Sequence, residues 1–200
     1  MKGLIALGVV VLVVVGVGGW GVGINNDLVR SEQGVNESWA QVQNVYQRRA
    51  DLIPNLVETA KAYMAHERQT LEAVVAARGT AMAGLSAAQA NPGDPAAMQQ
   101  LSQGQGVLNT ALGRLLAVAE QYPDLKANQN MMQLSEELTS TENRVAFARQ
   151  AYNDSVMSYN NNRETFPGSV FAGMFGFTAA AQLEIPPEHP EMRDAPKVQF

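Results

Sequence analysis

The chain has 200 residues, enough for one ordinary domain and an appendage. Its net charge of -5 and pI near 5.0 argue against nucleic acid as a partner, because binding phosphates needs a clustered basic surface. It has no cysteine, which excludes disulfides, thiolate metal sites and thiol catalysis. Apolar residues make up 46% of the chain but gather at its start, and the remainder is polar and rich in Ala and Gln. That remainder is typical of long exposed helices with narrow apolar stripes.

The first segment predicts a membrane anchor. Residues 4–24 read LIALGVVVLVVVGVGGWGVGI and carry no charge. A helix of about 21 residues spans roughly 31 Å, which matches the hydrocarbon core of a bilayer. A cleaved signal peptide has a shorter apolar core, of roughly 7 to 15 residues, and a small-x-small cleavage site. We therefore predict a retained transmembrane helix, with Trp20 at the interface.

Two features of this segment bear on orientation and association. Lys2 precedes it and only Arg30 follows closely, so the positive-inside rule favours a cytoplasmic N-terminus and an exported soluble domain. Gly19 and Gly23 form a G-x-x-x-G, a spacing that lets helices approach closely in lipid. This pair is the predicted site of transmembrane helix packing.

After the anchor, apolar residues recur at helical spacing and never alternate with period two, which predicts an all-α fold with no sheet. The anchor is followed by an antiparallel bundle of long helices. A loop is expected at Ala90-Asn91-Pro92-Gly93, and Asp94-Pro95 is a helix start signal. Pro123 interrupts the third stripe. The fourth stripe begins at Leu125 and closes at Asn160-Asn161-Asn162 and then Pro167-Gly168.

Pro54 leaves two arrangements open. A proline within a helix costs about 3 kcal/mol, so it usually begins, ends or kinks one. If Asp51–Pro54 is a reversal, the body is a four-helix up-down bundle. If Pro54 is a kink, the bundle has three helices, one of them long. The apolar register does not slip across Pro54, which favours a kink, whereas the helix lengths of compact bundles favour a reversal. We expect the four-helix arrangement.

Several motifs resemble those of the LemA family along nearly the whole chain: Gln47-Arg48-Arg49-Ala50-Asp51-Leu52-Ile53-Pro54-Asn55-Leu56-Val57, Tyr122-Pro123-Asp124-Leu125-Lys126-Ala127-Asn128 and Thr141-Glu142-Asn143-Arg144. The resemblance implies a bacterial protein with an N-terminal anchor, an antiparallel helical bundle and no established enzymatic activity. Relatives have been linked to membrane organisation, so it implies a scaffolding or partner-docking role, which is analogy from the fold. It places the protein in the bacterial inner membrane, as a single-pass protein.

Candidate chemistry is sparse. His66-Glu67 lacks the second histidine of a zinc H-E-x-x-H motif, because residue 70 is Thr. The helices contain no Glu-x-x-His pair of the kind that binds two irons in a bundle. We predict no catalytic, cofactor-binding or metal-binding residue, and no enzyme.

The two Pro-containing motifs suggest a docking surface. With an up-down topology and a reversal at Asp51–Pro54, both motifs would lie at the end of the bundle far from the bilayer. The residues expected to gather at this distal tip are Arg48, Arg49, Asp51, Asn55, Asp124, Lys126 and Asn128. They either cap helices and tie the turns together, or dock a partner.

The C-terminal part divides in two, which gives the expected organisation 1–24 anchor, 25–166 bundle, 167–184 apolar segment and 185–200 Pro-rich tail. The apolar segment would emerge beside the membrane. It would lie in the interface, pack against the base of the bundle, or contact a neighbouring subunit. Its candidate interfacial residues are Phe171, Met174, Phe175 and Phe177.

The sequence therefore favours a non-enzymatic structural or scaffold protein that self-assembles through its bundle at the cell envelope. The alternative is an adaptor that presents its distal tip to another envelope protein, such as a protease or transporter. The expected partners are the lipid bilayer, further copies of the chain and an envelope protein. A ligand-sensing bundle is disfavoured, because only Met1, Lys2 and Gly3 precede the span.

Overall fold

A single helix, α1 (Lys2–Lys61), runs from the apolar N-terminal segment into the body of the protein. The computed structural model describes residues 2–184. After α1 the chain forms α2 (Arg68–Ala90), α3 (Pro95–Ala119), the short α4 (Pro123–Lys126), α5 (Gln129–Glu164) and α6 (Gly168–Phe175). Within residues 2–184 there is no strand, so the all-α prediction is confirmed. The tail at 185–200 lies outside the described residues.

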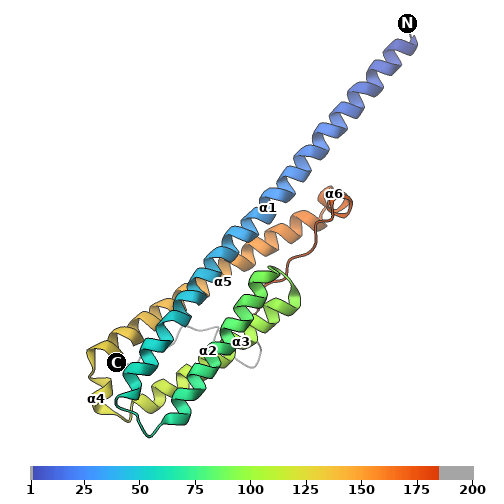
Figure 1. Ribbon diagram of the computed structural model, residues 1–200. Coiled ribbons are helices and arrows are strands. Elements are labelled where there is room, and N and C mark those ends of the chain that lie inside the picture. The colour runs from blue at the N-terminus through green and yellow to red at the C-terminus, as the bar shows by residue number, and fades with distance from the viewer. Residues whose placement is uncertain (1, 185–200) are drawn as a thin grey trace.

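The body is a four-helix up-down bundle built from two antiparallel pairs (Figure 1). α5 lies along α1, α3 lies along α2, and the pairs meet mainly through α1 and α2. The N-terminal third of α1 extends beyond the bundle. We call the bundle end nearest this extension proximal and the opposite end, where α4 lies, distal.

The reversal between α1 and α2 lies at residues 62–67, and Pro54 is inside α1. The expected reversal at Asp51–Pro54 is therefore wrong, although the expected number of bundle helices is right. A proline has no N–H to donate to the carbonyl four residues earlier, so the Ala50 carbonyl is left without its helical partner. The Arg78 Nε of α2 donates to this Ala50 oxygen at 2.7 Å. A neighbouring helix thus replaces the bond that Pro54 removes.

The expected start of α3 is confirmed. Pro95 is the first helical residue, and the Asp94 carboxylate accepts a hydrogen bond from the Ala97 N–H at 2.8 Å. Pro123 begins the one-turn α4, and the Asn128 side chain caps α5 by accepting from the Met131 N–H at 3.1 Å. α5 continues through Asn160–Asn162 to Glu164, slightly beyond the expected end.

The apolar interior forms two clusters. The distal cluster contains Leu52, Ile53, Leu56, Ala60, Met64, Leu71, Val74, Ala77, Ala81, Leu108, Leu112, Leu115, Ala119, Leu125, Met131 and Leu138. The proximal cluster contains Val35, Trp39, Val42, Tyr46, Leu85, Ala88, Ala97, Met98, Leu101, Val145, Ala148, Tyr152, Val156, Tyr159 and Leu183. These residues follow the helical stripes of the sequence, because the face that recurs every 3.6 residues is the face that each helix buries.

Candidate functional site

A buried polar layer separates the two apolar clusters, and Arg49 of α1 is its centre. The Arg49 side chain is only 2% exposed and forms an ion pair with Glu142 of α5, whose side chain is 30% exposed. Its guanidinium also donates to the Gln105 Oε1 of α3 at 3.3 Å and to the Asn109 side-chain oxygen. Burial lowers the pKa of Arg49, and the nearby Glu142 carboxylate opposes that shift. The layer thus holds one cation among three helices.

The remaining helix, α2, joins the same level of the bundle through Arg78 and the Ala50 carbonyl. One turn before Arg49, Tyr46 is buried, and burial raises its phenol pKa. On the outside, Arg48 pairs with Glu137 of α5. Polar contacts thus join all four helices at one level of the bundle.

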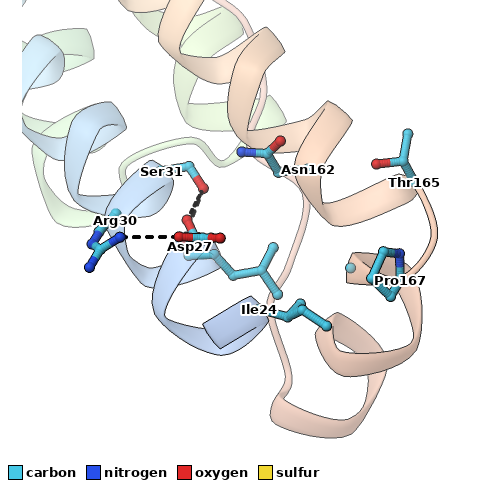
Figure 2. Close-up of a pocket in the computed structure, with 9 residues that line it drawn as sticks. Ile24, Asp27, Arg30, Ser31, Asn162, Thr165 and Pro167 are labelled. Atoms are coloured by element: carbon cyan, nitrogen blue, oxygen red, sulfur yellow. Dashed lines mark hydrogen bonds and ion pairs between the residues drawn. The ribbon is translucent and has the colours of Figure 1, made fainter. Parts of the chain in front are cut away.

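At the proximal end, α1, α5 and α6 surround a pocket of ≈ 460 Å³. Figure 2 shows Asp27 and Ser31 on α1, facing Asn162 and Thr165 on the other side. Asp27 pairs with Arg30, and both side chains are largely exposed. Within the part of the chain that the structure describes, no group of three His, Asp or Glu residues is arranged to hold a metal ion. The pocket offers hydrogen-bonding groups and one exposed ion pair.

Beyond α6, residues 177–184 form an extended segment, which we call the strap. Two asparagines of α5 recognise its main chain. Asn153 both donates to the Leu183 carbonyl at 3.2 Å and accepts from the Leu183 N–H at 2.8 Å. Asn160 binds Ala180 in the same two-bonded way, at 2.8 and 3.1 Å. The strap is thus held along α5 by its backbone, independently of most of its side chains.

Further bonds tie the strap to other elements. The Tyr152 hydroxyl of α5 donates to the Ala181 carbonyl at 2.9 Å, and the Ala181 N–H donates to the Gly93 carbonyl at 2.8 Å. The Ser102 hydroxyl of α3 donates to the Glu184 carbonyl at 2.7 Å. The Leu183 side chain is buried in the proximal cluster. The strap therefore bridges the two helix pairs at the proximal end.

The comparisons with known proteins agree on one family. A family model described as "LemA family" matches residues 38–200. This chain belongs to the LemA family. The matched residues include α1 from Ser38 onward, all of α2 to α6, the strap and the tail.

Curated relatives of this LemA-family chain include magnetosome proteins. "Magnetosome protein MamQ 2" of Paramagnetospirillum magneticum is 26% identical over 81% of this chain and 65% of its own length. "Magnetosome protein MamQ" of Magnetospirillum gryphiswaldense is 33% identical over 42% of this chain and 31% of its own. "Protein LemA" of Metamycoplasma hominis is 26% identical over 72% and 62%. The chain spans less than two thirds of the length of these relatives.

The LemA motif at residues 47–57 contributes Arg49 to the buried polar layer, and its Pro54 leaves the Ala50 carbonyl free to accept from Arg78. The structure does not gather the seven residues of the expected distal tip. Arg48, Arg49 and Asp51 lie about three turns or more before the end of α1. Asn55 lines a shallow groove of ≈ 510 Å³ between α1 and α5. The reason is the continuation of α1 through Pro54 to Lys61, which moves the turn beyond this motif.

Asp124, Lys126 and Asn128 do lie at the distal end, on and after α4. There the Asn128 side chain donates to the Tyr63 hydroxyl at 3.0 Å, and the Tyr122 hydroxyl donates to the Glu67 carboxylate at 3.3 Å. These bonds tie the first and third turns of the bundle together. Asp124 and Lys126 are exposed.

Two of the four candidate interfacial residues are exposed in the structure, and the other two pack on other parts of the protein. Met174 and Phe175 are exposed on α6, Phe171 packs on α1, and Phe177 packs against the proximal cluster. Around Gly19 and Gly23 a side-chain methyl group would meet no atom within 4 Å, so both glycines face open space. The sequence analysis did not identify Gly21, which contacts Phe171. It also did not identify Asn153 and Asn160, which bind the main chain of the strap. Asn153 and Asn160 are two helical turns apart on one face of α5, and this spacing is the sequence feature that could indicate a shared binding partner.

Proposed function

We propose that this LemA-family protein is a non-enzymatic scaffold, anchored in the bacterial inner membrane by α1 and assembled from several copies through the bundle. The observation that carries the proposal is the continuity of α1. Its 60 residues extend about 90 Å without a turn between the apolar segment and the bundle. A tether for a mobile adaptor needs a flexible linker, whereas a scaffold needs a fixed direction from the membrane.

Membrane anchoring is supported by the exposure of the apolar part of α1. This is the one helix within the described residues that is long and apolar enough to cross a membrane. Its side chains are not covered by the bundle, and ten of the exposed large apolar ones lie at Leu7, Val9, Val10, Val11, Leu12, Val13, Val14, Val15, Val17 and Val22. A core helix of a soluble protein would bury such side chains. Lys2 before this stretch supports a cytoplasmic N-terminus and an extracytoplasmic bundle.

The names of the relatives, such as "Magnetosome protein MamQ 2" and "Protein LemA", are not enzyme names, which agrees with a non-enzymatic role. Self-assembly is supported by the outer face of the α1–α5 pair. A groove of ≈ 530 Å³ lies there between Gln41, Asn44 and Val45 of α1 and Ser140, Arg144 and Phe147 of α5. Phe147 is 72% exposed, the most exposed large apolar side chain on α2, α3 and α5. Burying it in the groove of a second copy would remove that surface from water.

Disulfide crosslinking in native membranes tests the assembly, because the chain has no cysteine of its own. Phe147→Cys is expected to form crosslinked dimers on mild oxidation. The matched control is Val75→Cys on α2, which is also well exposed but lies on the other helix pair. If Phe147→Cys crosslinks no more than Val75→Cys, the α1–α5 face is not the contact between copies.

The second candidate function is an adaptor that docks an envelope protein at the distal end. Exposed Asp124 and Lys126 on α4 favour it, since the turns beneath them are already held by Tyr63, Glu67, Tyr122 and Asn128. Charge reversal by Asp124→Lys with Lys126→Glu is expected to abolish crosslinking to a partner while the bundle still assembles. Unchanged crosslinks from the distal end would rule out recognition by these two charges.

A further inference from the structure

α6 is an apolar helix that packs on the anchor helix and not on the bundle alone. No charged residue occurs from Phe166 to Leu183. The Phe171 ring lies against Gly21 of α1, where a side-chain methyl group would come within 2.8 Å of the Phe171 Cε1. The rings of Trp20 and Phe171 meet edge to face, with centroids 6.3 Å apart. The missing side chain at Gly21 therefore makes room for α6.

The contact between Phe171 and Gly21 lies within the uncharged part of α1. Gly21 precedes Asp27, the first charged residue after the apolar segment, by about 9 Å of helix. Gly168, at the start of α6, lines the pocket with Asp27, whereas Phe171 lies beside the uncharged part of α1, on the membrane side of its first charge. Figure 1 shows α6 next to the point where α1 leaves the bundle.

The outer face of α6 is apolar and uncovered. Met174 is 70% and Phe175 58% exposed, and Val170, one turn before Met174, is also exposed. Ala172 and Gly168, by contrast, are buried. Trp20, half-exposed beside α6, is of the type that collects at membrane interfaces. Three large apolar side chains of α6, Val170, Met174 and Phe175, are therefore uncovered near the level where α1 would leave the bilayer.

We propose that α6 lies in the interfacial layer of the bilayer, with Val170, Met174 and Phe175 inserted among the upper acyl chains. Together with α1 it gives the bundle two membrane contacts, which fix the angle between the bundle and the membrane. This inference rests on the proposed anchoring by α1. Amphipathic segments insert to about 5–10 Å at the headgroup boundary, which agrees with the position of Phe171 beside Gly21.

Site-specific fluorescence tests the position of α6. The full chain is reconstituted in phosphatidylethanolamine–phosphatidylglycerol vesicles with an environment-sensitive dye on a single cysteine. The quencher is lipid brominated near the top of the acyl chains. For Met174→Cys we expect a blue-shifted emission and at least about twofold stronger quenching than for Val75→Cys on α2. Emission and quenching equal to those of Val75→Cys would overturn the inference.

Val14→Cys in the apolar part of α1 separates this inference from the anchoring itself. If the dye at residue 14 is in lipid and the dye at 174 is in water, the α6 inference alone fails. If the dye at residue 14 is also in water, the anchoring by α1 fails. A dye at 174 that is shielded from bromolipid, and becomes quenched only when the protein is diluted with lipid, would place α6 against a second copy and would also overturn the inference.

A matched pair of substitutions tests whether the contact between Phe171 and Gly21 positions α6. In the Met174→Cys chain, Gly21→Leu is expected to displace Phe171 and to reduce quenching toward the Val75→Cys value. Gly23→Leu adds the same side chain where no atom lies within 4 Å, and it is expected to leave quenching unchanged. Equal quenching in both variants would show that the Phe171–Gly21 contact does not set the depth of α6.

Discussion

Arg49 is a charged side chain placed between two apolar clusters, and its neutralisation depends on Glu142. Removing one partner of a buried ion pair leaves the other charge without compensation in a medium that solvates it poorly. We expect Glu142→Ala to lower the free energy of unfolding by about 3 kcal/mol. Arg49→Met, which removes the buried charge and fills the space, is expected to cost less.

Urea titration of the detergent-solubilised full chain, followed by circular dichroism, measures both changes. The control is Glu137→Ala, which breaks the exposed pair with Arg48 and is expected to cost at most about 1 kcal/mol. A Glu142→Ala variant as stable as Glu137→Ala would mean that Gln105 and Asn109 suffice to hold the Arg49 cation.

The effects of Pro54 and Arg78 on stability are expected to be coupled, because Arg78 donates to the carbonyl that Pro54 leaves without a partner. Arg78→Ala leaves the Ala50 carbonyl without a partner and is expected to cost about 2 kcal/mol, as for a hydrogen bond from a charged donor. Pro54→Ala supplies the missing N–H within the helix. In the Pro54→Ala background we therefore expect Arg78→Ala to cost less than half as much, which a double-mutant cycle on the same urea titrations measures. Strictly additive effects would contradict this account of how α1 tolerates its proline.

At the scale of elements, the strap is attached to α5 through Tyr152, Asn153 and Asn160. Burial raises the pKa of the Tyr152 hydroxyl to about 12, from the ordinary value of 10.0. The folded state thus holds this proton more tightly than the unfolded chain does. Stability from this group is therefore fully present below pH 10 and is lost as the pH rises toward 12.

We expect the thermal midpoint to fall between pH 10 and pH 12, and to fall less steeply in Tyr152→Phe. Part of the slope should remain, because burial also raises the pKa of Tyr46 and Tyr159. The measurement is thermal unfolding by circular dichroism at a series of alkaline pH values. Equal slopes in the two proteins would show that the Tyr152 hydroxyl is not buried beneath the strap.

At the scale of the whole molecule, helical periodicity predicts the all-α fold, because each helix buries one stripe. The expectation of four bundle helices comes from the helix lengths of compact bundles, since the periodicity across Pro54 favours a kink. Local chemistry also predicts the start of α3, since Asp94 and Pro95 act within one turn. The course of α1 through Pro54 is not predictable in this way. What decides it is Arg78, a residue of another helix that donates to Ala50.

The same limit applies to the candidate sites. Gly21 and Phe171 meet only because α5 returns along α1, and no local pattern encodes a contact between residues so far apart. The strap is bound by its main chain, so its own side chains carry little signal. The expected distal tip does not form because the turn lies at residues 62–67 and not at Pro54.

The rigid connection between anchor and bundle leads to the central claim, which is assembly into a scaffold. The measurement that tests it most directly is the particle mass and shape of the full-length protein, extracted in mild detergent and imaged by negative-stain microscopy. We expect a discrete assembly of several copies, with the bundles held at one angle to the detergent belt. A particle that stays monomeric at every protein concentration would contradict it and would favour the adaptor at the distal end.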